Sequence, residues 1–200
     1  MLRKKLFFLC TLLLAVMLVL PLHAVELKPA GPNDVASGAA RDINVWCPGG
    51  IGGHWLAVGQ PNLCNRNDKV MFRFPLASFI AKGSVRKAVL KFNVTTDKRN
   101  VSPENLVLEH FTTDRRELTA QALLSTEVED ISNLASMNAG ANQNVVIDVT
   151  EFVNKDLAKG YVYVNFRVTS KTAEKLGAPK NGIVNCASIT KSSIVLDVTP

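Results

Sequence analysis

The sequence is poor in the residues on which most enzymes and most binders of flat ligands depend. Aromatic residues make up only 6% of its 200 residues, with two tryptophans and three histidines in all. None of the Gly-x-Ser-x-Gly, Walker, His-Glu-x-x-His or Cys-x-x-Cys motifs occurs. Few aromatic side chains leave little surface for stacking, and the missing motifs leave no catalytic constellation. We therefore expect a protein that is not an enzyme.

Concentrated charge is also missing. Charged residues make up 20% of the chain, and no block of five or more basic residues occurs beyond the N-terminus. This excludes the usual electrostatic signature of a nucleic-acid partner. A charged fraction this low, with a mean hydropathy of +0.13, also excludes disorder along the whole chain.

The N-terminus has the three-part layout of a secretory signal peptide. Basic residues 3–5 precede an apolar run over 6–20, and Pro21 to Ala24 follow. We expect residues 1–24 to be removed, which lowers the net charge from +6 to +3 because three basic residues leave. The product would be secreted, periplasmic or at the cell surface, with no membrane span. Leu22 is large for its place before the cut, so an uncleaved N-terminal anchor remains the alternative.

Three cysteines remain after the expected cleavage, namely Cys47, Cys64 and Cys186. Exported proteins meet an oxidising compartment, so we expect Cys47 to pair with Cys64. The bond would close a loop of about 18 residues and contribute about 3 kcal/mol. Cys186 is then a buried free thiol, and a bond between Cys47 and Cys186 is the open alternative.

Short segments with a period of two dominate the rest of the chain. Residues 25–41 contain Pro29, Gly31 and Pro32 and are expected to form a leader without regular structure. We predict one domain over residues 42–200. Strands are predicted at 42–46, 54–58, 69–74, 85–94, 106–111, 145–149, 161–168, 183–184 and 194–198. Helical turns are predicted at 76–80, 114–124, 150–157 and 171–176, and an irregular polar segment at 127–141.

Eight or nine short strands with little helix predict an all-β fold. We expect an antiparallel jelly-roll β-sandwich with short helical turns, in which the first and last strands are neighbours. His110 alternates within a predicted strand, so we expect its ring to be satisfied by a hydrogen bond inside the sheet.

Several segments together resemble the DNRLRE-type secreted β-sandwich domains. The similar segments are Leu56-Ala57-Val58-Gly59, residues 69–76, residues 83–92, Asp148-Val149-Thr150 and residues 187–191. Pro75 stands where that family has an acidic residue after Arg-Phe. The resemblance implies a secreted jelly-roll module, and characterised relatives bind acidic polysaccharides such as alginate.

The first candidate ligand site surrounds the glycine-rich loop at residues 48–53. Both tryptophans, Trp46 and Trp55, flank this loop together with His54. Indole faces stack on sugar rings, and glycine allows close backbone approach. The alternative is that both tryptophans belong to the core of the sandwich.

The second candidate site is basic. Arg73, Lys91 and Arg167 lie on predicted strands, where they would form one stripe on an outward sheet surface and bind carboxylate groups. The alternatives are an ordinary solvated face, or an ion pair of Arg73 with a neighbour such as Asp148.

No cofactor is expected, except that a structural Ca²⁺ could be held by Asp42, Asp68 and Asp197. The sequence thus favours an exported, non-catalytic carbohydrate-binding module for an acidic polysaccharide. A structural or adhesive surface protein that assembles with a partner is the alternative, and a polysaccharide-degrading enzyme is the third.

Overall fold

The computed structural model describes most of the chain beyond the N-terminal segment. The described residues are 23–29, 31, 34–40, 46–48, 55–60, 68–113, 118, 128–176 and 185–200. Within them the strands are β1 Val25–Leu27, β2 Val35–Ala40, β3 Trp46–Pro48, β4 Trp55–Gln60, β5 Lys69–Pro75, β6 Lys87–Thr96, β7 Leu106–Phe111, β8 Val128–Asn133, β9 Asn142–Asp148, β10 Tyr163–Ser170, β11 Asn185–Thr190 and β12 Val195–Thr199. The helices are α2 Ala77–Ile80, α4 Thr150–Ala158, α5 Lys171–Leu176 and the 3₁₀ turn η2 Lys191–Ser193.

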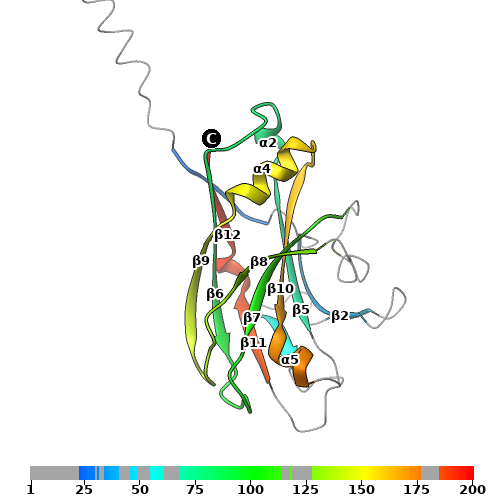
Figure 1. The fold of residues 1–200 in the computed structure, drawn as a ribbon, viewed down its shortest axis with the longest axis vertical. Coiled ribbons are helices and arrows are strands. Elements are labelled where there is room, and N and C mark those ends of the chain that lie inside the picture. The colour runs from blue at the N-terminus through cyan, green and yellow to red at the C-terminus, as the bar shows by residue number, and fades with distance from the viewer. Residues whose placement is uncertain are drawn as a thin grey trace, which may run out of the picture.

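The strands form two sheets in which the pairings between named strands are all antiparallel. Sheet A has the order β1-β12-β6-β11-β4, with β9 on the other side of β6. Sheet B has the order β3-β2-β5-β10-β7-β8. The strands β12 and β11 pair with successive halves of β6, and η2 separates them. Figure 1 shows the sheets as two long, curled layers.

The sheets enclose one apolar core, so the fold is the expected all-β antiparallel sandwich. From β4 to β12 the chain alternates between the sheets, except that β7 and β8 both lie in sheet B and that β11 and β12 both lie in sheet A. This strand order favours the jelly-roll winding, which remains an interpretation of the sequence and the topology.

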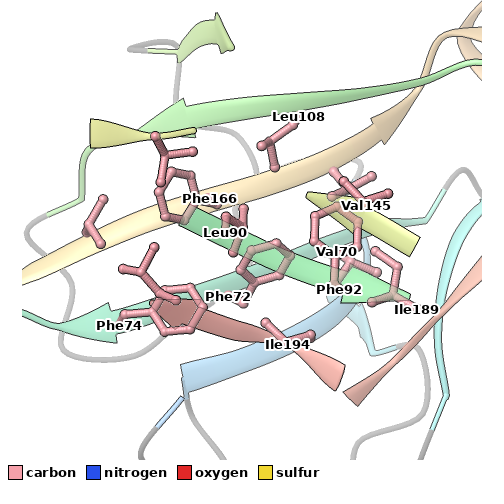
Figure 2. Packing of buried hydrophobic residues seen from close by; sticks show 14 of the residues in the cluster. Val70, Phe72, Phe74, Leu90, Phe92, Leu108, Val145, Phe166, Ile189 and Ile194 are labelled. Atoms are coloured by element: carbon pink, nitrogen blue, oxygen red, sulfur yellow. The ribbon is translucent and has the colours of Figure 1, made fainter. Parts of the chain in front are cut away.

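Aromatic rings at the centre of the core join the two sheets. Phe72 of β5 lies 5.7 Å, centroid to centroid, from Phe92 of sheet A. It also lies 6.2 Å from Phe166 and 6.1 Å from Phe74 of sheet B. All four side chains are buried, and Figure 2 shows them between the ribbons. Alternation in β5, β6 and β10 predicted these inward positions.

Helix α4 covers one end of the core, where Figure 1 shows it beside α2. It buries Val153, Asp156 and Leu157. Just before it, Asp148 Oδ1 accepts hydrogen bonds from the backbone nitrogen and hydroxyl of Thr150, at 3.0 and 2.5 Å. These bonds hold the pKa of Asp148 below its usual value, so the strand ends in an ionised carboxylate.

Three segments differ from the sequence-based prediction. Residues 25–41 were expected to lack regular structure, yet they contain β1 and β2. The segment 127–141 was expected to be irregular, yet it contains the polar strand β8. Residues 185–190 form β11, which is buried between β4 and β6 although its sequence has no clear alternation. The last strand, β12, lies between β6 and β1, with Val25 opposite Val198. Its neighbour from the start of the chain is thus β1 and not the strand predicted at 42–46.

Other predictions fall outside the described residues. These are the signal peptide up to residue 22, most of the strand at 42–46, the helix at 114–124 apart from Leu118, and the strand at 183–184. Among the helices that are described, none has the length and apolar character needed to cross a bilayer.

Two glycines with positive φ allow a direct test of how tightly β4 and β11 approach. A Cβ on Gly59, whose φ is +93°, would lie 2.6 Å from the carbonyl oxygen of Asn185, whereas a Cβ on Gly83, at φ +69°, would meet nothing within 4 Å. We expect Gly83→Ala to cost about 1–2 kcal/mol from its backbone conformation alone. Gly59→Ala should cost roughly 1–3 kcal/mol more, because the backbone must also shift.

Urea unfolding of both variants measures this difference. Equal losses would show that the strands separate enough to admit a methyl group.

Candidate functional site

The outward side of the central strands of sheet B, β5, β10 and β7, is buried, although sandwich sheets commonly expose one face. The residues that alternate with the core positions of β5, β7 and β10 are all at most 4% exposed. They are Met71, Arg73, Val107, Glu109, Phe111, Asn165, Arg167 and Thr169. Several of these side chains are charged or polar, so this face requires internal partners.

Each buried arginine on this face has a carboxylate partner. Arg73 Nε donates to Asp34 Oδ1 at 2.5 Å, and the guanidinium lies 4.3 Å from the ring centroid of Tyr163. Arg167 Nε donates to Glu109 Oε2 at 2.6 Å, across neighbouring strands. All four charged side chains are less than 10% exposed. The arginines therefore neutralise charge inside the protein.

Asn165 lies between these two ion pairs in the sheet. It is opposite Arg73 on β5 and opposite Phe111 on β7. The residue is 4% exposed, and its Oδ1 has no hydrogen-bond partner among the described residues. This oxygen is an acceptor that a buried water or a ligand hydroxyl would satisfy.

The outward side of sheet A is open and polar. Asn93 Nδ2 on β6 donates to Asn142 Oδ1 at 2.7 Å and to Asn144 Oδ1 at 3.0 Å on β9. Thr95 and Ser188 lie in the adjoining row and are half-buried. The three asparagines, which we call the amide cluster, thus present hydrogen-bonding groups on a paired, rigid sheet.

The same face carries charges of both signs. Lys91 Nζ lies 2.5 Å from Asp197 Oδ2, with both side chains partly exposed. Glu26, Asp197 and Asp148 follow one another across the strands in a single row with Val89. This face therefore has no excess of positive charge.

The predicted basic stripe is not formed by these residues. Arg73 and Arg167 lie on sheet B and are buried in ion pairs, whereas Lys91 lies on sheet A and pairs with Asp197. The partner of Arg73 is Asp34, not Asp148. Alternation assigned the arginines correctly to the side away from the core, but it carried no information on whether that side is covered.

The tryptophan site is only partly described. Trp46 and Cys47 belong to β3 in sheet B, and Trp55 belongs to β4 in sheet A, opposite Thr190. His54, Cys64 and Asp42 lie outside the described residues. The Cys47–Cys64 disulfide and the sugar-stacking role of the tryptophans therefore stay predictions.

The two described calcium candidates do not share a site. Asp68 is buried in a β-bridge with Gly59, next to Cys186 in the register of sheet A. Asp197 lies eleven positions further along the β11–β12 run, roughly 30 Å away at strand spacing. Within the described part of the chain, no group of three or more His, Cys, Asp or Glu side chains could hold a metal ion.

Cys186 is the free, buried thiol expected from the sequence, so the alternative bond to Cys47 is wrong. Burial is the main cause that raises the pKa of this thiol to about 12, and the nearby carboxylates of Asp97 and Glu104 add to it. A protonated, buried thiol is unreactive, and the residue acts in packing.

His110 is hydrogen bonded inside the sandwich, as predicted. Its Nε2 lies 3.0 Å from Asp156 Oδ2 of α4, and its ring centroid is 5.3 Å from that of Phe152. Both His110 and Asp156 are buried. The pair links β7 to the helix that covers the core.

A buried carboxyl that the sequence did not indicate connects the loop before β7 to β10 and β11. Glu104 is fully buried and accepts hydrogen bonds from the Ser170 hydroxyl and from Asn185 Nδ2, the latter at 2.6 Å. Asn185 Oδ1 in turn accepts from the backbone nitrogen of Ser102 at 2.9 Å. Burial raises the pKa of Glu104 to about 7, although both hydrogen bonds lower it. Glu104 follows Pro103 in a polar loop and gave no periodic signal.

No family model matches this chain, and no curated protein matches it. The resemblance to DNRLRE-type domains therefore has no support from these comparisons. Among solved structures, the chain is similar to the CBM22-1–GH10 modules of xylanase 10B from Clostridium thermocellum, complexed with xylohexaose. The identity is 8% and the TM-score 0.37, over 89% of this chain and 29% of that one. It is also similar to the K1 cleaved adhesin domain of Lys-gingipain from Porphyromonas gingivalis W83. Here the identity is 14% and the TM-score 0.31, over 87% of this chain and 96% of that one.

The buried Arg167–Glu109 pair can be tested by removing one charge and then both. Arg167→Met leaves Glu109 buried without this partner, and we expect a loss of about 3–5 kcal/mol of unfolding free energy. Adding Glu109→Leu should recover most of that loss, because no unpaired charge then remains. Urea unfolding measures both values. A change under about 0.5 kcal/mol for Arg167→Met would instead indicate an exposed side chain that is free for ligand.

The pKa of Glu104 makes the stability depend on pH. The folded value of about 7 lies above the ordinary value of 4.5, so folding favours the protonated form. The associated stability is complete below pH 4.5 and is lost as the pH rises through 7, at about 1.4 kcal/mol for each pH unit between these two values.

Unfolding free energies of the native protein and of Glu104→Gln, measured from pH 4.5 to 8, isolate this effect. We expect the native protein to lose roughly 3 kcal/mol more than the variant over this range. Equal pH profiles would mean that Glu104 is ionised in the folded protein.

Proposed function

We propose that this protein is a non-catalytic carbohydrate-binding β-sandwich, and that it holds a polysaccharide on the outward face of sheet A. The observation that carries the proposal is the contrast between the two outward faces. The face of sheet B is buried over β5, β10 and β7, and its arginines are neutralised. The face of sheet A exposes the amide cluster on paired strands.

Amide and hydroxyl groups suit this ligand. Sugar hydroxyls donate and accept hydrogen bonds in the same way as asparagine side chains, which carry one acceptor oxygen and two donor hydrogens. Antiparallel pairing between β6 and β9 fixes the spacing of these groups, so little conformational entropy is lost on binding. The proposal keeps the sugar-stacking role predicted for Trp55, because its strand β4 belongs to the same sheet.

The charges of this face favour a neutral polysaccharide over the acidic one expected from the sequence. Lys87 and Lys91 share the face with Glu26, Asp148 and Asp197. Lys91 is already paired with Asp197. Glu26 is likewise paired with Lys28, so the positive and negative groups of this face balance and give an acidic chain no net attraction.

The state of the carboxyls supports the non-catalytic part of the proposal. On the face of sheet A, Asp148 is bonded to Thr150 and Asp197 is paired with Lys91. Asp34, Glu104, Glu109 and Asp156 are each hydrogen bonded to a neighbouring side chain and are inaccessible to solvent. Glycosidases instead need two carboxyl groups that flank an accessible sugar bond. A structural or adhesive role on a cell surface is the second candidate, since the same exposed sheet can serve assembly.

Binding to a panel of neutral polysaccharides (xylan, mannan, cellulose) and acidic ones (alginate, pectin) tests this proposal. The double variant Asn142→Ala with Asn144→Ala should weaken binding to the preferred polysaccharide by roughly tenfold, since each lost hydrogen bond costs about 1 kcal/mol. Asn133→Ala, an exposed asparagine of β8 in the other sheet, is the matched control and should change nothing. Affinity electrophoresis and calorimetry provide the measurements.

Different outcomes separate the candidates. Binding only to acidic polysaccharides, weakened by salt, would restore the ligand class implied by the resemblance. Binding to none of the panel would overturn the carbohydrate proposal and favour the structural or adhesive role. Release of shortened chains from any polysaccharide would establish an enzyme.

A further inference from the structure

The strand β9 forms an outer edge of sheet A. It pairs with β6 over seven residues, from Asn142 to Asp148. Among the described residues, no strand pairs with its other side, and Figure 1 shows it at the margin of the molecule. Edge strands carry backbone groups that can pair with a further chain.

The register identifies which backbone groups point outward. Val149 N donates to Ala88 O, and Thr96 N donates to Ala141 O, each at 2.9 Å. Bonding in an antiparallel ladder alternates, so the odd-numbered positions of β9 bond to β6. The even-numbered positions, 142, 144, 146 and 148, direct their N–H and C=O groups away from the sheet. The side chains at these four positions are also exposed.

This edge lacks the features that normally block pairing. Proteins protect edge strands with lysine, proline, bulges or covering segments. The β9 sequence Asn-Gln-Asn-Val-Val-Ile-Asp contains no lysine or proline, and its register with β6 has no shift. In contrast β8, the edge of sheet B, carries exposed Glu129 and Asp130 and follows a register shift. Val146 at the centre of β9 is 62% exposed.

The edge is complementary to a second copy of itself. Antiparallel pairing about a twofold axis at Val146 places Val146 opposite its copy and Asn144 opposite Asp148. Asn144 uses its Oδ1 to accept from Asn93, and Asp148 uses its Oδ1 to accept from Thr150. The Nδ2 of Asn144 and the Oδ2 of Asp148 have no partner among the described residues, so they can bond across the axis twice.

We propose that two copies of this chain pair through β9 and join their A sheets into one continuous sheet. The occupant of the edge is thus a second copy, held by backbone bonds, one valine contact and two amide-to-carboxylate bonds. The inference shares Asn144 with the carbohydrate proposal, and its test therefore rests on Val146 and on the oligomeric state. A dimer would also place two amide clusters side by side and raise avidity for a long polymer.

Sedimentation equilibrium of the protein produced from the full chain tests the dimer. We expect a concentration-dependent dimer. Val146→Lys should raise the dissociation constant of the dimer by roughly tenfold or more, because two like charges would meet at the twofold axis. Val146→Pro should do the same, since it removes an outward N–H that β6 does not use. Val101→Lys is the matched control, because Val101 is 61% exposed and lies outside the strands.

A charge exchange tests the register. Asn144→Asp alone should weaken the dimer, because the new carboxylate would lie opposite Asp148 of the second copy. Asn144→Asp combined with Asp148→Asn should restore the dimer. Circular dichroism and melting temperature, unchanged in Val146→Lys, exclude unfolding as the cause.

A protein that stays monomeric up to 100 µM, roughly the range of weak specific dimers, overturns the proposal. A dimer that Val146→Lys leaves intact overturns it as well, since another surface would then be responsible. Neither result depends on polysaccharide binding, which is measured separately.

Discussion

The structure depends on the burial of the central strands of sheet B, β5, β10 and β7, on both of their faces. Their inward side supplies Phe72, Phe74 and Phe166 to the core. Their outward side is equally buried, yet it carries charge. Two arginines can occupy that environment only because Asp34 and Glu109 lie within hydrogen-bonding distance. This constraint leaves sheet A as the open surface, and it explains why the arginines are not available to a ligand.

Alternation in the sequence predicted the parts of the fold in which each strand has one apolar face. β5, β6, β7, β10 and β12 lie within two residues of their predicted bounds, because Val, Phe and Leu recur there at every second position. β8 was not predicted, since its only apolar residues, Val128 and Ile131, are three positions apart and show no period of two. β11 was missed for the opposite reason, because Asn185, Cys186 and Ala187 are all buried.

The candidate sites were harder to predict than the fold. The sequence placed Arg73 and Arg167 on the side away from the core, which is correct, but a covered outward face looks the same as an exposed one in a period-two pattern. The amide cluster also left no signal, because Asn93 and Asn144 are far apart in the chain and meet only through the β6–β9 register. Contacts of this kind depend on pairing, which a single sequence does not state.

The pairing of β1 with β12 joins the two extremes of the described chain. Val25 lies opposite Val198, and Leu27 lies opposite Leu196. Sheet A therefore cannot be completed until almost every residue has been synthesised and is free to move. Contacts at such large sequence separation slow folding, because the intervening chain must first be ordered or closed into a loop. Sheet A is therefore expected to close late in folding, after β6 and β12 have paired.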